Sequence, residues 1–269
     1  MKFKMPLPLL LVTIALVANT GCRKEKEQSF DIVSARDDAR AELSWNDVFE
    51  TVDEVASNTD GLKSGNFPCV DTCIVDTLAS PMTLLIDFGS DYCVGNDGRT
   101  RTGQILVTFT GRYRDPGTVI VITPQNHYVD GYLIEGVKTV TNQGNNGNGQ
   151  PYFSVVVSEA SITAPNNEYT ITWNSTRTRT WISGYNTLAL WDDVYEITGE
   201  ANGINRDGEA FSVAITEALR LALNCPWITS GTVQITPSNG PLRVRDYGNG
   251  TCDNDATVTV NGNVYEIVL

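Results

Sequence analysis

Eight of the 13 arginines in this sequence occur in pairs with one residue between them. The pairs are Arg99 and Arg101, Arg112 and Arg114, Arg177 and Arg179, and Arg243 and Arg245. Residues two apart on a strand share a face, so neighbouring strands would gather the guanidinium groups into a basic patch. Such a patch could bind an anionic glycan, with Trp173 or Trp181 as a stacking partner. The candidate anionic-ligand patch comprises Arg99, Arg101, Arg112, Arg114, Arg177, Arg179 and Trp181.

An ordinary structural role for these arginines is the interpretation that we favour. Arginines on strands pair with Asp or Glu on neighbouring strands, on the solvated face of a sheet. The segment 176–181 alternates Thr with Arg and ends in Trp, as a strand with two different faces would. Binding of an anionic ligand and cross-strand pairing therefore both remain open.

Catalytic residues are few. His127 is the only histidine, so a Ser-His-Asp triad would have to use it, and no Gly-x-Ser-x-Gly motif occurs. A structural role is expected for this histidine. Glycoside hydrolysis needs two carboxylates across a cleft. The available acids include Glu135, Glu159, Asp192, Asp193 and Glu196, which we expect on the solvated surface. We therefore predict no catalytic residue and no enzymatic activity.

Metal ligands are equally sparse. Zinc sites need several His or Cys ligands, and the cysteines are expected to form disulfides. Oxygen ligands that suit calcium cluster around Asp97 and around Asp253 and Asp255. Asp and Asn are also ordinary turn residues, and neither loop has the EF-hand spacing. We predict no metal and no cofactor, and these three aspartates are the residues to test for calcium.

The elements that must position these residues are one helix and many strands. Segment 34–57 is predicted to be a helix, because Leu43, Val48, Val52 and Val55 recur near helical spacing and acids fill the remaining face. From about residue 82 onward, apolar and polar residues alternate, and Asn261-Gly262 favours a two-residue hairpin turn. The fold class is therefore mainly β, an antiparallel meander or a β-sandwich-like body, with one N-terminal α-helix.

An internal repeat organises the cysteines. Segment 84–89 leads to Cys93 and segment 242–248 leads to Cys252, and each segment contains Asp, an aromatic residue and Gly in succession. Each cysteine also has an upstream partner. We therefore predict the disulfides Cys73–Cys93 and Cys225–Cys252, which leaves Cys69 unpaired. The Asn- and Gly-rich stretch 143–150 could divide the β-rich body, residues 69–269, into two related halves.

The N-terminus carries an export signal. Lys2 and Lys4 precede an apolar run that is too short to span a bilayer, and Thr20-Gly21-Cys22 follows it. These three residues resemble the lipobox of bacterial lipoproteins, although Asn19 stands where Leu is usual. The resemblance implies a signal peptide at 1–21 and acyl chains on Cys22, which would anchor the protein stably. Ordinary signal cleavage is the alternative.

The residues after Cys22 predict a tether. Segment 22–33 begins with a polar, charged stretch that has no apolar period, which is typical of a solvated linker. In bacterial lipoproteins, Asp after the cysteine favours retention in the inner membrane. Arg23 at this position therefore implies the outer membrane, and the charged stretch resembles surface-export signals of Bacteroidota lipoproteins.

The charge of the chain limits its partners. The sequence holds 32 acidic and 19 basic residues, a net charge of −13. This acidity favours solubility outside the cytoplasm and argues against general nucleic-acid binding. We expect a membrane partner through the lipid anchor, and a glycan or an envelope protein as a further partner.

Four segments resemble a group of Bacteroidota lipoproteins that have no assigned activity. These are Ile-Asp-Phe-Gly at 86–89, Asp-Gly-Arg-Thr-Arg-Thr-Gly at 97–103, the segment 176–181, and Asp-Tyr-Gly-Asn-Gly-Thr-Cys-Asp-Asn at 246–254. The resemblance spans about residues 30–269. It implies an envelope lipoprotein with a β-rich body and implies no activity.

These features together predict a lipid-anchored cell-envelope protein. Its β body is expected to act at the cell surface as a non-enzymatic binding or structural module, similar to an adhesin. Two alternatives stay open. One is a periplasm-facing component of an envelope assembly, in which helix 34–57 docks a partner. The other is a carbohydrate-active enzyme that uses two of the acids.

Overall fold

The computed structural model describes residues 32–57, 69–187, 189 and 191–269. These residues form one α-helix, one antiparallel sheet of 14 strands and a short 3₁₀ turn. The predicted fold class is confirmed, and the meander is the correct alternative because all strands belong to one sheet. The predicted signal peptide, Cys22 and nearly all of the predicted tether lie outside the described residues.

The bounds of the elements are as follows. The helix is α2 (Val33–Ser57), which agrees with the prediction of 34–57, and the 3₁₀ turn is η1 (Pro165–Asn167). The strands are β1 (Thr72–Asp76), β2 (Met82–Asp87), β3 (Cys93–Val94), β4 (Thr100–Phe109), β5 (Val119–Val129), β6 (Tyr132–Asn145), β7 (Pro151–Thr163), β8 (Thr170–Ser183), β9 (Val194–Ile204), β10 (Ala210–Ala222), β11 (Ile228–Pro237), β12 (Arg243–Asn249), β13 (Asp255–Val260) and β14 (Asn263–Val268).

The strands follow one another in the sheet in chain order. The path runs β1-β2-β4 and then consecutively to β14, and the short β3 pairs with β4. Tight turns make this order possible. Asn261 and Gly262, between β13 and β14, have φ values of 50° and 81°, which is the pair of positive angles that a two-residue hairpin needs. The predicted hairpin at these residues is confirmed.

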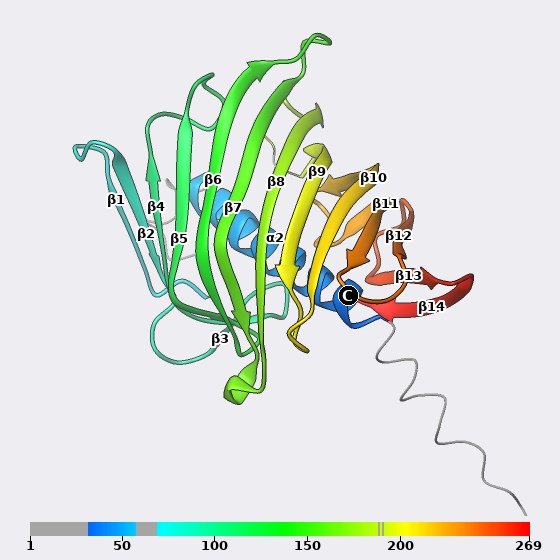
Figure 1. The fold of residues 1–269 in the computed structure, drawn as a ribbon. Coiled ribbons are helices and arrows are strands. Elements are labelled where there is room, and N and C mark those ends of the chain that lie inside the picture. Colours follow the sequence, from blue (N-terminus) through cyan, green and yellow to red (C-terminus); the bar gives the residue numbers. More distant parts are fainter. Residues whose placement is uncertain (1–31, 58–68, 188, 190) are drawn as a thin grey trace, which may run out of the picture. The chain divides into compact units, whose positions relative to one another are not determined.

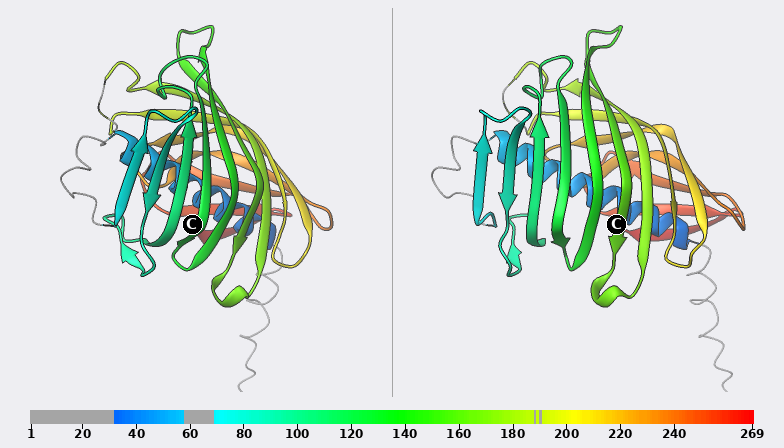
Figure 2. Two further views of the ribbon diagram at one scale, coloured as in Figure 1. Left: turned by 90° about the vertical axis from the view of Figure 1, so that its left-hand side faces the viewer. Right: turned by 60° about the vertical axis from the view of Figure 1, so that its left-hand side comes forward.

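The sheet of residues 69–269 curls, and helix α2 crosses its concave side (Figures 1 and 2). The helix contacts strands from β2 to β11, so it touches both ends of the curl. No helix among the described residues is long and apolar enough to cross a membrane. The concave face and the helix together form the core.

Glycines at irregular positions help the sheet to bend. The register of β6 against β7 shifts at Gly136 (φ 126°), and the register of β11 against β12 shifts at Gly231 (φ 108°). A Cβ atom at Gly136 would lie 2.7 Å from the Cα of Ala160, and one at Gly231 would lie 2.4 Å from the carbonyl oxygen of Ala218. Bulges of this kind increase local twist, which favours the strong curvature.

The predicted disulfide Cys225–Cys252 is present, whereas the predicted disulfide Cys73–Cys93 is wrong. Cys93 pairs with Cys69, with Cα atoms 5.3 Å apart, and Cys73 is free. Cys73 lies inside β1, opposite Ile86 of β2. Cys93 lies in β3, which pairs with β4 just beyond the residues of β4 that pair with β2. Ile86 pairs with Ile105 of β4, whereas Cys93 pairs with Arg101, so the register separates the two cysteines by four residues along the strands. The order cysteine, strand, strand, cysteine is the same in both disulfide units.

The two Asp-containing segments of the repeat also share a local geometry. The backbone N–H of Gly89 donates to Asp87 at 2.8 Å, and the N–H of Gly248 donates to Asp246 at 2.8 Å. Each aspartate thus closes the same small turn before its cysteine.

The expected division near 143–150 is not seen in the described chain. This stretch forms the turn between β6 and β7, which pair along most of their length. Residues 32–269 are one compact unit. Its Asn and Gly residues form this turn, in which the side-chain oxygen of Asn146 accepts hydrogen bonds from the backbone N–H groups of Asn148 and Gln150.

Candidate functional site

Helix α2 directs its acids into the curled sheet. Asp37 and Asp38 are fully buried, and Glu42 and Asp47 are exposed by only 5% and 3%. The apolar residues of the same helix are buried too, so the helix is enclosed on nearly all sides. A buried carboxylate without a partner is costly. The arginines of the sheet supply the partners.

Asp38 is bound by two strands that are far apart in the sheet. Trp173 of β8 donates its indole N–H to Asp38 at 2.9 Å, and Arg245 of β12 donates to the other oxygen at 2.7 Å. Arg245 also donates to the backbone carbonyl of Ala35 at 2.6 Å. These contacts fix the first half of the helix across the concave face.

The other helix acids reach further parts of the sheet. Asp37 accepts the backbone N–H of Arg206 at 2.7 Å and its Nε at 2.8 Å, in the turn between β9 and β10. Glu42 pairs with Arg177 of β8 at 2.7 Å. Asp47 pairs with Arg99 at 2.7 Å and with Arg101 of β4. The acids along α2 thus define which part of the helix faces which strand.

The pair of Glu42 and Arg177 is fully charged. Burial acts to raise the pKa of Glu42, but the charge and hydrogen bond of Arg177, with Lys138 and Arg245 nearby, lower the pKa overall. Burial likewise acts to lower the pKa of Arg177, but the charges of Glu42 and Asp38 raise it overall. Each partner therefore holds the other in its ionised state.

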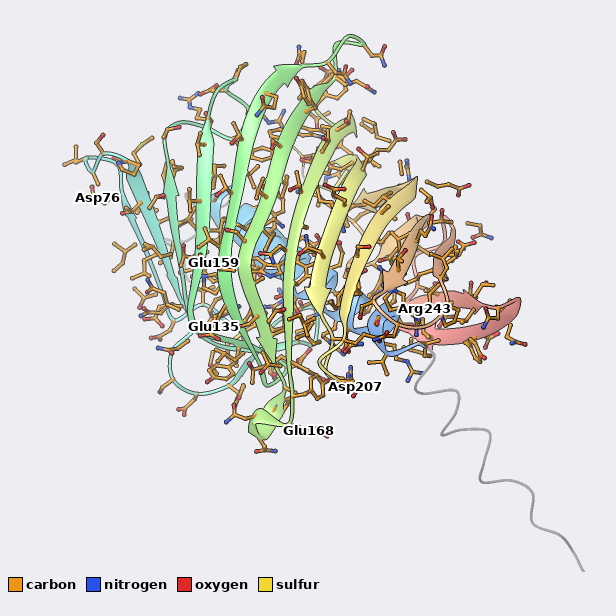
Figure 3. The ribbon with its side chains drawn as sticks, in the orientation of Figure 1. Asp76, Glu135, Glu159, Glu168, Asp207 and Arg243 are labelled. Carbon is orange, nitrogen blue, oxygen red and sulfur yellow. A yellow bond between two sulfur atoms is a disulfide. The ribbon has the colours of Figure 1, made fainter. Side chains whose placement is uncertain are left out.

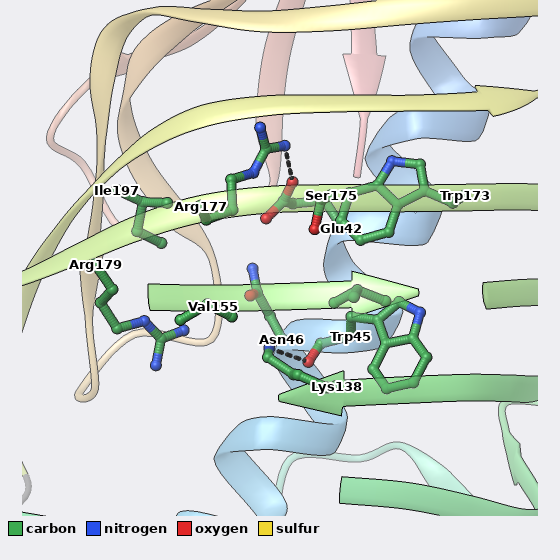
Figure 4. Close-up of a pocket in the computed structure, with 11 residues that line it drawn as sticks. Glu42, Trp45, Asn46, Lys138, Val155, Trp173, Ser175, Arg177, Arg179 and Ile197 are labelled. Carbon is green, nitrogen blue, oxygen red and sulfur yellow. Dashed lines mark hydrogen bonds and ion pairs between the residues drawn. The ribbon is translucent and has the colours of Figure 1, made fainter. Parts of the chain in front are cut away.

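A small pocket lies where α2 faces β6, β7, β8 and β9 (Figure 4). Its polar lining consists of Glu42, Asn46, Lys138, Ser175, Arg177 and Arg179. The volume open to the centre of a water molecule is only about 10 Å³. This is about the space that one water-sized occupant needs, so the pocket is too small for a sugar or a nucleotide.

Lys138 is the buried amine at this pocket. It is 2% exposed, and its ammonium group donates to the backbone carbonyl of Trp45 at 3.0 Å. Burial and the nearby charge of Arg179 lower its pKa to about 7, although Glu42 and Glu50 act to raise it. A lysine with so low a pKa is unusual, and burial is its main cause.

A second polar cluster lies at the end of α2, around Asp53 and Asp193. Burial raises the pKa of Asp53 to about 6. Burial, together with the charges of Asp53 and Asp192, also raises the pKa of Asp193 to about 6. The ring of Trp181 stacks on Tyr195 with centroids 5.4 Å apart, and Arg114 lies 4.3 Å from the centroid of the Trp181 ring. The aromatic faces are therefore covered by the protein itself.

The structure divides the candidate anionic-ligand patch between the interior and the surface. Arg101, Arg177, Arg179 and Trp181 are buried on the concave side. Arg99 lies beside them and pairs with Asp47. Arg112 and Arg114 are exposed in the turn between β4 and β5. The interior arginines therefore face helix α2 and not solvent. Arg99, Arg101 and Arg177 pair with acids of α2, whereas acids of neighbouring strands were expected as their partners.

The remaining candidates have local structural roles. His127 is fully buried and donates from Nδ1 to the carbonyl of Thr102 at 3.0 Å, and burial lowers its pKa to about 4. Asp97 pairs with Arg101 at 2.6 Å, and Asp253 accepts the N–H of Asp255 at 3.1 Å. The described residues contain no group of three or more His, Cys, Asp or Glu placed to hold a metal ion.

The acids considered for glycoside hydrolysis differ in their exposure. Glu135 and Glu159 are exposed on β6 and β7 and Glu196 is exposed on β9, whereas Asp193 is buried. Figure 3 labels Glu135 and Glu159, along with the exposed Glu168 and Asp207 near the turns at one end of the sheet. Glu135 accepts the hydroxyl of Ser161 at 3.0 Å.

The acids of α2 are the functional residues that the sequence interpretation did not identify. They were predicted only to fill the remaining face of the helix, which carries just two bases of its own, Arg36 and Arg40. The paired arginines of the strands were the complementary signal. Read together, an acidic helix and arginine-rich strands predict a buried interface between them.

Comparison of the chain with protein-family models, with curated proteins and with solved structures finds no match.

Proposed function

We propose that this protein is a lipid-anchored protein of the bacterial outer membrane, and that its β body is a non-enzymatic binding or structural module. The anchor is proposed from the sequence of residues 1–22, which resembles a lipoprotein signal. The module is proposed from the structure of residues 32–269. A position at the cell surface is part of the proposal.

One observation supports the module most strongly: the chain fills its own concave face. In a curled sheet this face is where a ligand would be enclosed, and here helix α2 occupies it. Most of the arginines that could have bound an anionic ligand there are neutralised by Asp38, Glu42 and Asp47. An external partner is therefore left with the convex face, the turns and the sheet edges.

The convex face has a composition that suits contact with another surface. On β8 the side chains between the buried arginines are threonines, and Thr176 and Thr178 are exposed. The register places Thr176 between Val156 of β7 and the exposed Glu200 of β9, and Thr178 beside Thr198 of β9. The threonines offer hydroxyl groups that both donate and accept hydrogen bonds, which suits contacts with polar groups such as sugars or peptide backbones.

The two alternatives receive less support. Docking of a partner on helix 34–57 would require the helix to leave its own sheet and to break its buried ion pairs. A carbohydrate-active enzyme would need two acids across a cleft, and the one pocket described above is lined by a single acid, Glu42, which is bound to Arg177.

The lipid anchor is tested by the substitution Cys22→Ala. Cells grown with a labelled fatty acid should label the unmodified protein and should not label the variant, which should move from the membrane fraction to the soluble fraction. Cys73→Ala is the matched control, because Cys73 is a free cysteine in β1 and should leave labelling unchanged. Labelling that persists in Cys22→Ala would contradict the anchor.

Protease treatment of intact cells tests the position of the β body. Loss of the protein from a blot of intact cells supports a module at the cell surface. Protection in intact cells, with digestion after lysis, would overturn the surface position and would favour a periplasmic envelope partner.

A further inference from the structure

The pocket beside α2 holds many hydrogen-bond donors and few acceptors. Nε1 of Trp45, Nδ2 of Asn46, Nε and Nη1 of Arg177, and Nη1 of Arg179 are buried and have no hydrogen-bond partner within the described part of the chain. All four side chains line the pocket, and none is more than 7% exposed. These N–H groups can only donate. Leaving buried donors without an acceptor is costly, so an acceptor is expected among them.

The charges around the pocket lead to the same requirement. Three bases line it, Lys138, Arg177 and Arg179, and the only acid that lines it is Glu42. Glu42 is bound to Arg177 at 2.7 Å. Arg179 instead lies against the faces of Phe49 and Tyr195, at 4.1 Å and 5.1 Å from the ring centroids. The pocket lining therefore has an excess of positive charge inside the protein.

The size of the pocket restricts what could meet this requirement. About 10 Å³ is open to the centre of a water molecule. This is enough for one small occupant, such as a water molecule or a monatomic ion. A water molecule accepts only two hydrogen bonds and carries no charge. A halide ion is spherical, accepts several N–H donors and offsets the positive charge.

We propose that this pocket binds a single halide-sized anion, chloride under ordinary conditions, between helix α2 and strands β6 to β8. The donors are Asn46, Arg177 and Arg179, with the ammonium group of Lys138 near Asn46, whereas the indole of Trp45 lies on the side of Asn46 away from Arg179 (Figure 4). The ion would join helix and sheet at a point where, among the described residues, no helix carboxylate forms an ion pair with Arg179 or Lys138, although the charges of Glu42 and Glu50 act on Lys138. It therefore completes the set of charge contacts along α2.

The pKa of Lys138 would respond to an anion in the pocket. Burial and the charge of Arg179 lower the pKa of this lysine to about 7. An anion in the pocket would favour the charged lysine and would reduce this shift.

Chloride dependence of thermal stability tests the proposal. The purified protein is melted in sodium chloride and in sodium gluconate at the same ionic strength, because gluconate is too large for the pocket. Chloride should raise Tm in a saturable way, by roughly 2–4 °C if the ion binds with moderate affinity. Bromide should act like chloride. Equal Tm values in chloride and in gluconate would overturn the proposal.

Two variants connect the effect to the pocket. Asn46→Asp places a carboxylate among the donors, so it should abolish the chloride dependence while the protein stays folded. Thr178→Ala is the matched control, because it changes the exposed face of the same strand and should keep the full chloride dependence. An Asn46→Asp protein that responds to chloride like the unmodified protein would count against the site.

A direct measurement removes dependence on the variants. Crystals of the unmodified protein grown in sodium bromide should show an anomalous scattering peak in the pocket between Asn46 and Arg179. Density for water alone at that position would overturn the proposal, even if the variants fail to fold.

Discussion

Glu50 and Lys138 have opposite charges and titrate near the same pH. Burial, followed by the charge of Asp47, raises the pKa of Glu50 from 4.5 to about 7. Burial and Arg179 lower the pKa of Lys138 from 10.5 to about 7. A carboxyl with a raised pKa stabilises the folded state at low pH, and this contribution is lost as the pH rises from 4.5 to about 7. A lysine with a lowered pKa has the opposite effect between about 7 and 10.5, where stability rises with pH.

The substitution Glu50→Gln should remove the loss of stability that accompanies ionisation of Glu50. Between pH 4.5 and about 7, the unmodified protein should lose stability relative to the variant, and the difference should level off above pH 7 at roughly 3 kcal/mol. Urea unfolding at several pH values measures the difference. Glu196→Gln, on the exposed face of β9, is the control and should run parallel to the unmodified protein. Parallel curves for Glu50→Gln would show that Glu50 does not titrate in this range.

Helix α2 and the sheet depend on each other through buried ion pairs. Asp38 and Arg245 are 0% exposed, and each is bound to more than one group. A buried pair of this kind adds little net stability compared with apolar residues, but removal of one partner leaves a buried charge. The pairs therefore determine where the helix lies more than how stable the fold is.

A double-mutant cycle at Asp38 and Arg245 tests this. Asp38→Asn alone should cost about 3–5 kcal/mol, because Arg245 would stay buried without its carboxylate. Asp38→Asn combined with Arg245→Met should cost clearly less than the sum of the single changes. Asp207→Asn, in an exposed turn, is the control and should have almost no effect. Additive losses in the cycle would mean that the two residues are not coupled.

The positions of the helix and strands could be predicted from the sequence better than which face of each strand is buried. Alternation located the strands, and Asn261-Gly262 located a turn, because both depend on local backbone geometry. The segment 176–181 shows what was not predictable: Thr and Arg alternate, both are polar, and only the position of α2 makes the arginine side the interior. Cys69 illustrates a different limit. Its pairing depends on strand register, because both Cys69 and Cys73 precede Cys93 and the repeat in the sequence does not show which of them lies before β1.

Across the described chain, each disulfide secures a pair of strands near one end of the sheet. Cys69–Cys93 encloses β1 and β2, and Cys225–Cys252 encloses β11 and β12. The sequence separations are 24 and 27 residues. On the chain-entropy model a loop of this size contributes about 3–4 kcal/mol. The ends of a long open sheet are where strands would separate first, so cross-links there are effective.

Removal of either disulfide should therefore destabilise the fold by a similar amount. Cys69→Ser with Cys93→Ser, and Cys225→Ser with Cys252→Ser, should each lower the free energy of unfolding by about 3–4 kcal/mol. Cys73→Ser should change it little, because this thiol is free. Peptide mapping without reduction checks the pairing first, and a link between Cys73 and Cys93 would contradict it.

The sequence separation between Asp38 and Arg245, 207 residues, has a consequence for how the protein is made. Synthesis begins at the N-terminus, so α2 is the first part of the described chain to exist, and Arg245 is nearly the last. Neighbouring strands can pair in order as they emerge, since each hairpin is local. The first helix has to wait for the end of the chain before all its acids have partners. A product that stops before β12 would therefore lack the arginine that pairs with the buried carboxylate of Asp38. We expect such a product to be more open to proteolysis than the full chain.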